Sequence, residues 1–287
     1  MASLKEVKGR IASVNSTRKI TSAMKMVASA KLHKAQAAIE SMLPYERRLH
    51  HILTDFMSNC TEVTSPFIVK REVKKVAVVV FASNTSLCGG FNANVIRHLV
   101  DLLAEYKPLG LENILVFPVG KKVADAVRKL GFRIEGDFQH MADKPSYQEA
   151  ADLAADLMKR FLHGDVDKVE LLYNHFKSTA SQILTRETYL PIDLNNEKKE
   201  EERTIDYILE PSAEELMQEM LPKVLRMKMF TVLLDSNVAE HAARTMAMQI
   251  ATDNANELLQ ELTVMYNKSR QQSITNELLD IVGGSMA

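Results

Sequence analysis

No glycine or proline occurs between Lys223 and Val282, a stretch of 60 residues. At 1.5 Å per residue, an unbroken helix of that length would be about 90 Å long, several times the length of an average globular helix. Apolar side chains recur along the stretch at heptad-like intervals: Met229, Val232, Ala243, Met246, Ile250, Leu258, Leu262 and Met265. The sequence therefore predicts one very long helix that pairs lengthwise with another.

The first 60 residues offer a partner of suitable length. Their apolar pattern runs through Leu4, Val7, Ile11 and Val14, slips, and resumes at Leu32, Ala35, Ile39 and Met42. A slip of this kind is a stutter in a heptad seam. Pro44 interrupts the pattern, and we expect it to kink or redirect the helix before residues 45–58 continue it.

The two ends carry opposite charge. Residues 1–60 hold ten Lys/Arg and four Asp/Glu, a net +6, whereas residues 204–287 hold six Lys/Arg and twelve Asp/Glu, a net −6. A basic helix can bind nucleic acid or anionic lipid. We favour pairing within the chain, because an equal and opposite helix lies in the same molecule. An antiparallel coiled coil of residues 1–60 with residues 206–287 follows.

Residues 72–194 have a different character. Buried-strand patterns are predicted at residues 74–83, 113–120, 168–176 and 181–192, the last two forming a hairpin. Helical patterns alternate with them at residues 91–106, 121–131 and 146–162. This order predicts a small Rossmann-like α/β domain. The fold class is therefore α/β with long terminal helices, and the charged residues 195–203 form a linker into the second long helix.

Composition and cysteine usage limit the functional classes. The longest apolar runs, such as Val76–Ala82, are too short to cross a bilayer. Cys60 and Cys88 have neither disulfide-scaffold nor zinc-site spacing, so we expect a reducing compartment, the cytoplasm. The adjacent His50 and His51 point about 100° apart on a helix and do not form a metal site alone.

Residues 86–94, "SLCGGFNAN", follow a predicted strand and open a helix, which is where Rossmann domains bind phosphate. Neither G-x-G-x-x-G nor a Walker A motif is present, and nothing marks a histidine partner for Cys88. We therefore favour a tight structural turn. The sequence indicates no catalytic residue, no metal and no cofactor.

Fifteen methionines include clusters at residues 23–28, 227–229 and 246–248 of the long helices. Methionine fills a coiled-coil seam well, and it equally suits a surface that meets several partner surfaces. Both interpretations stay open on the sequence alone.

Residues 11–35 ("IASVNSTRKITSAMKMVASAKLHKA") and 242–284 ("AARTMAMQIATDNANELLQELTVMYNKSRQQSITNELLDIVGG") closely resemble the terminal helices of the gamma-subunit family of F-type ATP synthases. "SLCGGFN" resembles the start of that family's central domain. The resemblance covers essentially the whole chain and is loosest over residues 120–205.

The resemblance implies a rotor shaft that stands inside a ring of three alpha and three beta subunits. Its α/β domain would lie beside epsilon and on the membrane-embedded c-ring, at the cytoplasmic face of a bacterial cell membrane. The chain would touch the membrane only through the c-ring, would bind no nucleic acid, and would leave the chemistry to its partners. Its rotation would regulate ATP synthesis, ATP hydrolysis and proton flow.

Individual positions can be carried over from the family's motifs. Met24 and Lys25 match positions that face a beta-subunit lever. Contacts to catch loops of the ring are implied for Arg244, Arg270, Gln271 and Thr275. In the segment "DYILEP", Tyr207 and Glu210 match residues that seat the family on the c-ring.

The chain also departs from the family. Asn84, Thr85 and Ser86 stand where relatives often have Asp-Arg-Gly, and the cysteine-bearing insertion of photosynthetic relatives is absent, so we expect no thiol regulation. Two competing classes remain: a coiled-coil adaptor that itself binds a nucleotide, and a nucleic-acid-binding basic helix.

The lengths of the two helices predict where pairing stops. If both leave the domain near Cys60 and Ser212, antiparallel pairing sets Leu4 opposite about residue 268. The apolar stripe thins at the same place, in residues 266–277. We therefore predict that these residues begin a part of the second helix that continues alone.

Overall fold

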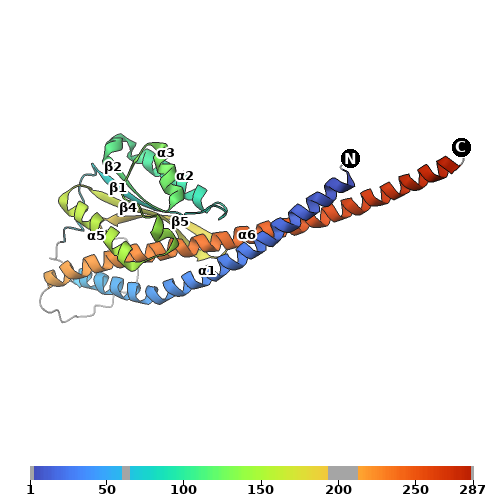
Figure 1. The fold of residues 1–287 in the computed structure, drawn as a ribbon. Helices are drawn as coiled ribbons and strands as arrows, with labels where there is room; N and C mark the ends of the chain where they lie inside the picture. The colour runs from blue at the N-terminus through green and yellow to red at the C-terminus, as the bar shows by residue number, and fades with distance from the viewer. Residues whose placement is uncertain (1–2, 60–64, 193–212, 286–287) are drawn as a thin grey trace.

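Two long helices and one α/β domain make up the protein, which is described here from a computed structural model covering residues 3–59, 65–192 and 213–285. Helix α1 spans Leu4–Asn59 and helix α6 spans Ala213–Ser285. They run antiparallel, and α6 projects well beyond the N-terminus (Figure 1). The predicted fold class is confirmed. The predicted linker at 195–203 and Cys60 lie outside the described residues.

Hydrogen bonds fix the register of the two helices. Thr252 Oγ1 donates to Thr21 Oγ1 at 2.8 Å, and Arg18 Nη1 donates to Asn256 Oδ1 at 3.3 Å. Further down, Ala35 packs in one buried cluster with Val238. Counting residue by residue from Thr21 and Thr252 also sets Ala35 opposite Val238, so one register holds along the coiled coil.

The seam follows a strict heptad. On α1 it runs through the buried Val7, Ala28 and Ala35 and the half-buried Val14 and Thr21, and on α6 through the buried Met248, Ala255 and Leu262. The predicted stutter is therefore wrong: the seam continues through Thr21 and Ala28, whose side chains are too small or too polar to show as a large apolar stripe.

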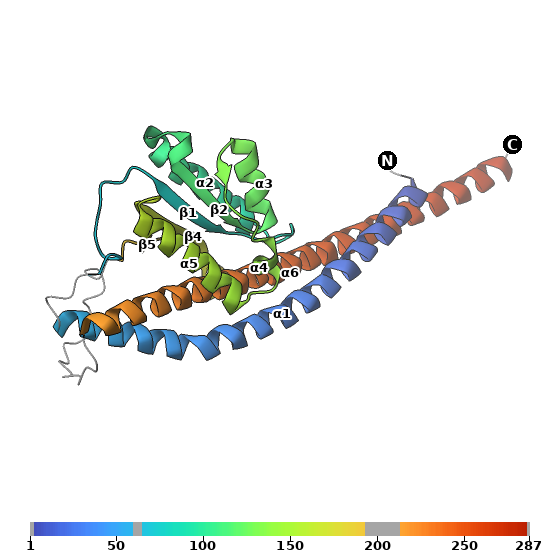
Figure 2. The same cartoon turned by 60° about the vertical axis from the view of Figure 1, so that its left-hand side comes forward.

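Pro44 lies inside α1, which continues through it to Asn59 and curves beneath α6 (Figure 2). The apolar stripe predicted for α6 is partly wrong. Four members of the predicted α6 stripe are exposed because α1 packs on a neighbouring line of that helix: Met246, Ile250, Leu258 and Met265. These side chains face outward from the pair.

A five-stranded sheet forms the α/β domain, with the order β3-β2-β1-β4-β5. The strands are β1 Val76–Phe81, β2 Ile114–Val119, β3 Arg133–Ile134, β4 Lys168–Ser178 and β5 Ser181–Leu190. All pair in parallel except β5, which forms the predicted antiparallel hairpin with β4. The domain's helices are α2 Phe91–Tyr106, α3 Lys121–Leu130, α4 Gln139–Asp143 and α5 Tyr147–His163, with short 3₁₀ turns η1 Lys107–Leu109 and η2 Leu111–Asn113. Only β3, α4 and the 3₁₀ turns were not predicted, because they are too short to show a period.

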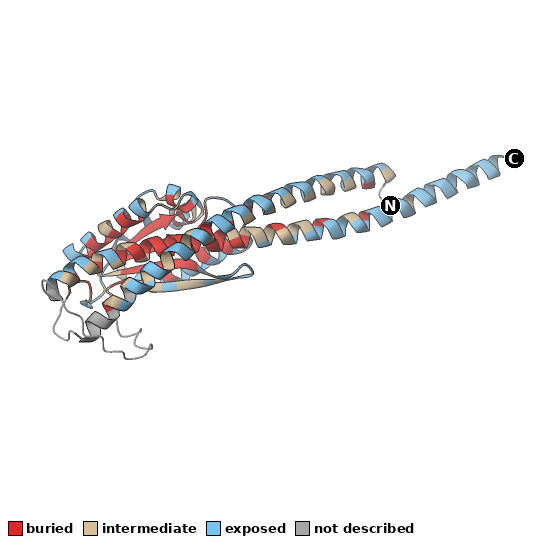
Figure 3. Cartoon of the chain, turned by 90° about the horizontal axis from the view of Figure 1, so that it is seen from below, coloured by how far each residue is buried: buried red, intermediate tan, exposed pale blue. Residues whose placement is uncertain are grey.

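The sheet separates two cores, because successive side chains of a strand point to opposite faces. Val78 and Val80 pack with α2 and α3, whereas Val79 and Phe81 pack with α5 and α6. Helix α6 is therefore a covering layer of the domain as well as half of the coiled coil. Its buried segment lies against the sheet, and its far end is exposed all round (Figure 3).

Candidate functional site

The end of α6 continues without a partner helix. Counting outward from Thr21 and Thr252 sets Leu4, the first residue of α1, opposite Ser269. Leu262 is the last buried residue described on α6, and every residue from 271 to 282 is exposed (Figure 3). The predicted lone segment is confirmed. It begins within a residue or two of the predicted position.

Three predicted site residues lie on this projecting segment. Arg270, Gln271 and Thr275 are all exposed, and Thr275 Oγ1 donates to the Gln271 carbonyl one turn back. Because α6 has lost its partner, these side chains are presented on a bare helix. Beyond them the apolar side chains Leu278, Leu279, Ile281 and Val282 are also exposed.

A second candidate surface lies lower on the coiled coil. Met24 and Lys25 are half-buried beside α6. Their neighbours Met26 and Val27 are more exposed, at 65% and 59%. Both belong to the methionine cluster at residues 23–28 that the sequence singled out. Met229 and Met248 are buried in the core, as the first interpretation of the methionines expects, while Met26 faces solvent. The second interpretation, a surface that meets partners, stays a prediction.

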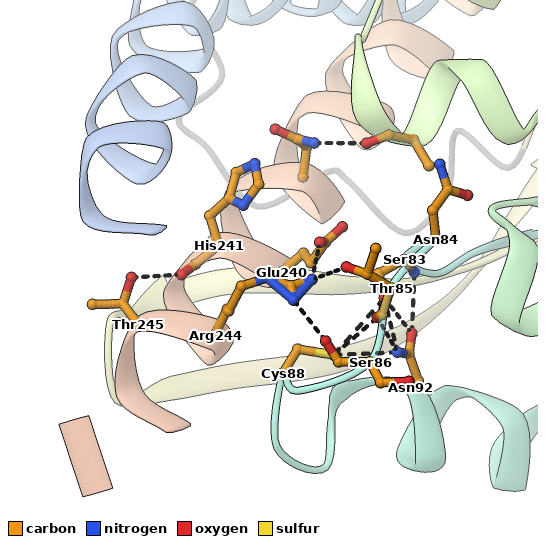
Figure 4. Close-up of polar contacts among 12 residues, drawn as sticks. Ser83, Asn84, Thr85, Ser86, Cys88, Asn92, Glu240, His241, Arg244 and Thr245 are labelled. Atoms are coloured by element: carbon orange, nitrogen blue, oxygen red, sulfur yellow. Dashed lines mark hydrogen bonds and ion pairs between the residues drawn. The ribbon is translucent and has the colours of Figure 1, made fainter. Parts of the chain in front are cut away.

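Arg244 is held inside the molecule. Its guanidinium donates to Thr85 Oγ1 at 2.9 Å and to the Ser86 carbonyl at 3.0 Å, and it forms an ion pair with Glu240 one turn back on α6 (Figure 4). Only 12% of the side chain is exposed. This arrangement places Thr85 and Ser86 directly against α6.

The loop between β1 and α2 is also fixed from the domain side. The Asn84 side chain donates to the Gln139 carbonyl and accepts from the Lys121 amide, both at 2.8 Å. Ser83 and Asn92 both donate to the Thr85 carbonyl (Figure 4). These hydrogen bonds hold the loop as a tight turn between the domain and α6.

Two titratable groups beside Arg244 are perturbed by burial. Burial raises the pKa of Glu240, and the nearby Arg244 charge only partly offsets this. Burial, together with the charges of Lys31 and Arg244, lowers the pKa of His241 to about 4. His241 Nδ1 is buried without a hydrogen-bond partner. The neutral form of this histidine is therefore strongly favoured in the folded protein.

Tyr207 and Glu210 lie outside the described residues. Within the described ranges, no group of three or more His, Cys, Asp or Glu side chains is placed to hold a metal ion. No helix among these residues is both long and apolar enough to cross a membrane.

Comparison with known proteins identifies the family. The family model for ATP synthase matches residues 3–287. The ATP synthase gamma chain of Phocaeicola vulgatus is 81% identical over 289 residues, which covers all of both chains. The chain belongs to the ATP synthase gamma-chain family. A second gamma chain, from Bacteroides fragilis, is 64% identical over 290 residues and also covers all of both chains.

Solved structures agree in fold with this gamma-chain assignment. A chain of the mitochondrial ATP synthase of Euglena gracilis aligns over 99% of this chain and 93% of its own, with a TM-score of 0.62 and 20% identity. A chain from the central stalk and c-ring of the Tetrahymena thermophila enzyme aligns over 81% and 99%, with a TM-score of 0.55 and 22% identity. Gamma chains are the central stalk of F-type ATP synthase, and two antiparallel helices of unequal length make such a stalk here.

Proposed function

We propose that the chain is the turning shaft of the synthase, carrying rotation from a c-ring to catalytic beta subunits. The observation that supports this most is the part of α6 beyond Ser269, a helix exposed on all sides. Helices gain most of their stability from packing an apolar face. A long helix that has lost its partner, yet ends in exposed leucine, isoleucine and valine, needs a surrounding protein.

The pattern of side chains on this segment suits a moving contact. Arg270, Gln271 and Thr275 form hydrogen bonds that can be made and broken as the shaft turns. The exposed apolar tip, Leu278 to Val282, suits a collar that holds the end of the shaft without binding one face of it. We assign both surfaces to a ring of three alpha and three beta subunits.

A second ring contact lies at Met24 and Lys25. The exposed Met26 and Val27 extend it on α1, and the exposed Met246 and Ile250 lie at a similar level on α6. Apolar and flexible side chains at this level suit a surface that meets three equivalent subunits in turn. Arg244 belongs to the same level, although its guanidinium is engaged within the chain.

The opposite end of the molecule would face the membrane. Tyr207 and Glu210 are the candidate contacts to the c-ring, with epsilon beside the α/β domain. The chain would thus be a peripheral subunit at the cytoplasmic face of a bacterial cell membrane, and it would be non-catalytic because the beta subunits bind and convert the nucleotide.

Reconstitution tests this function. Purified alpha and beta subunits are mixed with the full chain, and ATP hydrolysis and subunit ratio are measured after size separation. The proposal predicts an active complex with one copy of the chain per three beta subunits. Stoichiometric binding of labelled ATP to the isolated chain would instead support a nucleotide-binding adaptor.

A further inference from the structure

The hairpin of β4 and β5 reaches past the rest of the sheet. The pairing of β4 with β1 ends at Leu172, whereas its pairing with β5 continues to Ser178. The register of the hairpin shifts just after Phe176. Irregularities of this kind bend a strand and re-aim its side chains. The end of β4 therefore leaves the sheet beside the long helices, where Figure 1 shows the hairpin in yellow.

One carboxylate of α6 holds this end of β4. Asp235 Oδ1 accepts a hydrogen bond from the Phe176 amide at 2.8 Å, and Asp235 Oδ2 lies 2.6 Å from His175 Nδ1. Only 10% of the Asp235 side chain is exposed. Hydrogen bonds to a charged group are stronger than neutral ones, and a buried carboxylate without partners is costly. The backbone of β4 is therefore fastened firmly to α6 at this point.

The side chain of Phe176 lies where three parts of the molecule meet. It packs against the seam between the two long helices, at the buried residues Leu32, Ala35, Val238 and Ala242. It also packs against the cluster that joins the start of α2 to α6, formed by Cys88, Phe91, Ala239 and Ala243. One aromatic side chain thus connects α1, α6 and the α/β domain.

This junction lies close to where the coiled coil leaves the domain. Further along α6, Arg244 still bonds to the domain, through Thr85 and the Ser86 carbonyl. Further out again, Thr252 and Asn256 of α6 bond to α1 instead. Any torque that passes between the domain and the free part of the shaft must therefore cross the level of Phe176.

We propose that Phe176 and Asp235 form a torsional joint: they are positioning residues that hold the domain, α1 and α6 as one body where the shaft leaves the domain. The inference rests on the proposed function and deepens it, because a rotor must carry torque across this level. The main core fastens α6 to the sheet, and Phe176 adds Leu32 and Ala35 of α1 to the same attachment. Without the joint, the pair of helices would twist more easily against the domain.

Two variants weaken the joint, and three controls isolate it. Asp235→Ala removes both acceptor oxygens, and Phe176→Leu removes the aromatic ring but keeps an apolar side chain, so that folding is retained. Asp235→Asn keeps an oxygen that can accept from the Phe176 amide, and it should behave like the unaltered chain. Phe132→Leu is a matched control, because Phe132 is also half-buried but packs against the domain's other core. Asp125→Ala is the second, because Asp125 pairs with Arg128 on its own helix.

The angular motion of the assembled rotor measures the joint. The ring of the reconstituted complex is fixed to a surface, and a bead is attached to the domain through Lys129→Cys, an exposed position at the end of α3. The spread of bead angles within each pause reports the torsional stiffness between the domain and the ring. Asp235→Ala and Phe176→Leu should each raise the angular variance about 1.5- to twofold, because close packing transmits strain and its loss leaves a softer connection. The double variant should rise no further than the larger single variant, because both changes act on one contact.

ATP hydrolysis by the same complexes should stay unchanged, since a softer shaft still turns. This separates loss of the joint from a general loss of structure. An unchanged variance in Asp235→Ala or Phe176→Leu, or an equal rise in Phe132→Leu or Asp125→Ala, would overturn the inference. If the bead on the unaltered chain does not turn at all, the proposed function fails instead.

Discussion

The hydroxyl oxygens of Thr21 and Thr252 lie 2.8 Å apart across the two long helices, in the middle of the seam that joins them. This contact and the nearby Arg18–Asn256 hydrogen bond form a polar layer between buried apolar positions. Polar layers in coiled coils specify register, because a shift would leave their partners unpaired. The register in turn fixes how much of α6 projects.

A cross-link tests this register. Cysteines replacing Thr21 and Thr252 should form a disulfide under mild oxidation, since directly facing side chains meet the geometric requirement. The pair Thr21→Cys and Thr245→Cys is the control, because Thr245 lies two turns, or about 10 Å, away along α6. Mass spectrometry of the linked peptides reads out the result. Equal linking of both pairs would contradict a fixed register.

The lengths of the two helices predicted where their pairing ends. The heptad seam was harder to predict, because small residues occupy several of its positions. The two chain lengths set Leu4 opposite about residue 268, and the contacts set it opposite Ser269. The seam itself was misread, because Thr21 and Ala28 occupy heptad positions that a search for large apolar side chains skips. The contact of Arg244 with Thr85 joins residues far apart in the sequence, and no local pattern marks it.

Gly120 is predicted to tolerate no side chain. A Cβ there would lie 2.2 Å from the Ala82 carbonyl oxygen, at the crossover between β2 and α3. Gly120→Ala should therefore destabilise the chain by roughly 3 kcal/mol or more. Gly131 also has positive φ but has open space around it, so Gly131→Ala should cost only about 1 kcal/mol. Urea unfolding of the isolated chain measures both; equal losses would refute the steric argument.

We expect the folded chain to lose stability in acid because of the lowered pKa of His241. Its pKa falls from 6.5 to about 4 on folding, so the unfolded chain binds the proton first as the pH drops. Above about pH 6.5 His241 is neutral in both states, and its full contribution to the stability of the folded chain is present. That contribution is lost as the pH falls towards 4. The loss is at most roughly 3.5 kcal/mol, at about 1.4 kcal/mol per pKa unit, and partial exposure of the side chain reduces it.

The variant His241→Gln isolates this effect, because glutamine does not titrate while Glu240 and the neighbouring charges remain. The stability difference between the unaltered chain and this variant should change between pH 7 and pH 4.5, with the unaltered chain losing more. A difference that stays constant across this range would show that His241 keeps its ordinary pKa.

Arg270 and Gln271 should affect the assembled enzyme without affecting the isolated chain. Both are exposed on the projecting helix, so Arg270→Ala and Gln271→Ala should change the melting temperature of the chain by no more than a degree or two. ATP hydrolysis by the reconstituted complex should fall several-fold. Lys268→Ala, an exposed position on the same helix, is the control and should retain activity.

Direct observation of rotation tests the central claim. The ring of alpha and beta subunits is fixed to a surface, and a bead is attached through Lys129→Cys, an exposed position at the end of α3. With ATP present, the bead should turn in one direction with three evenly spaced pauses per revolution, and stop when ATP is removed. Sustained ATP hydrolysis while the bead on the assembled chain stays still would contradict a rotating shaft.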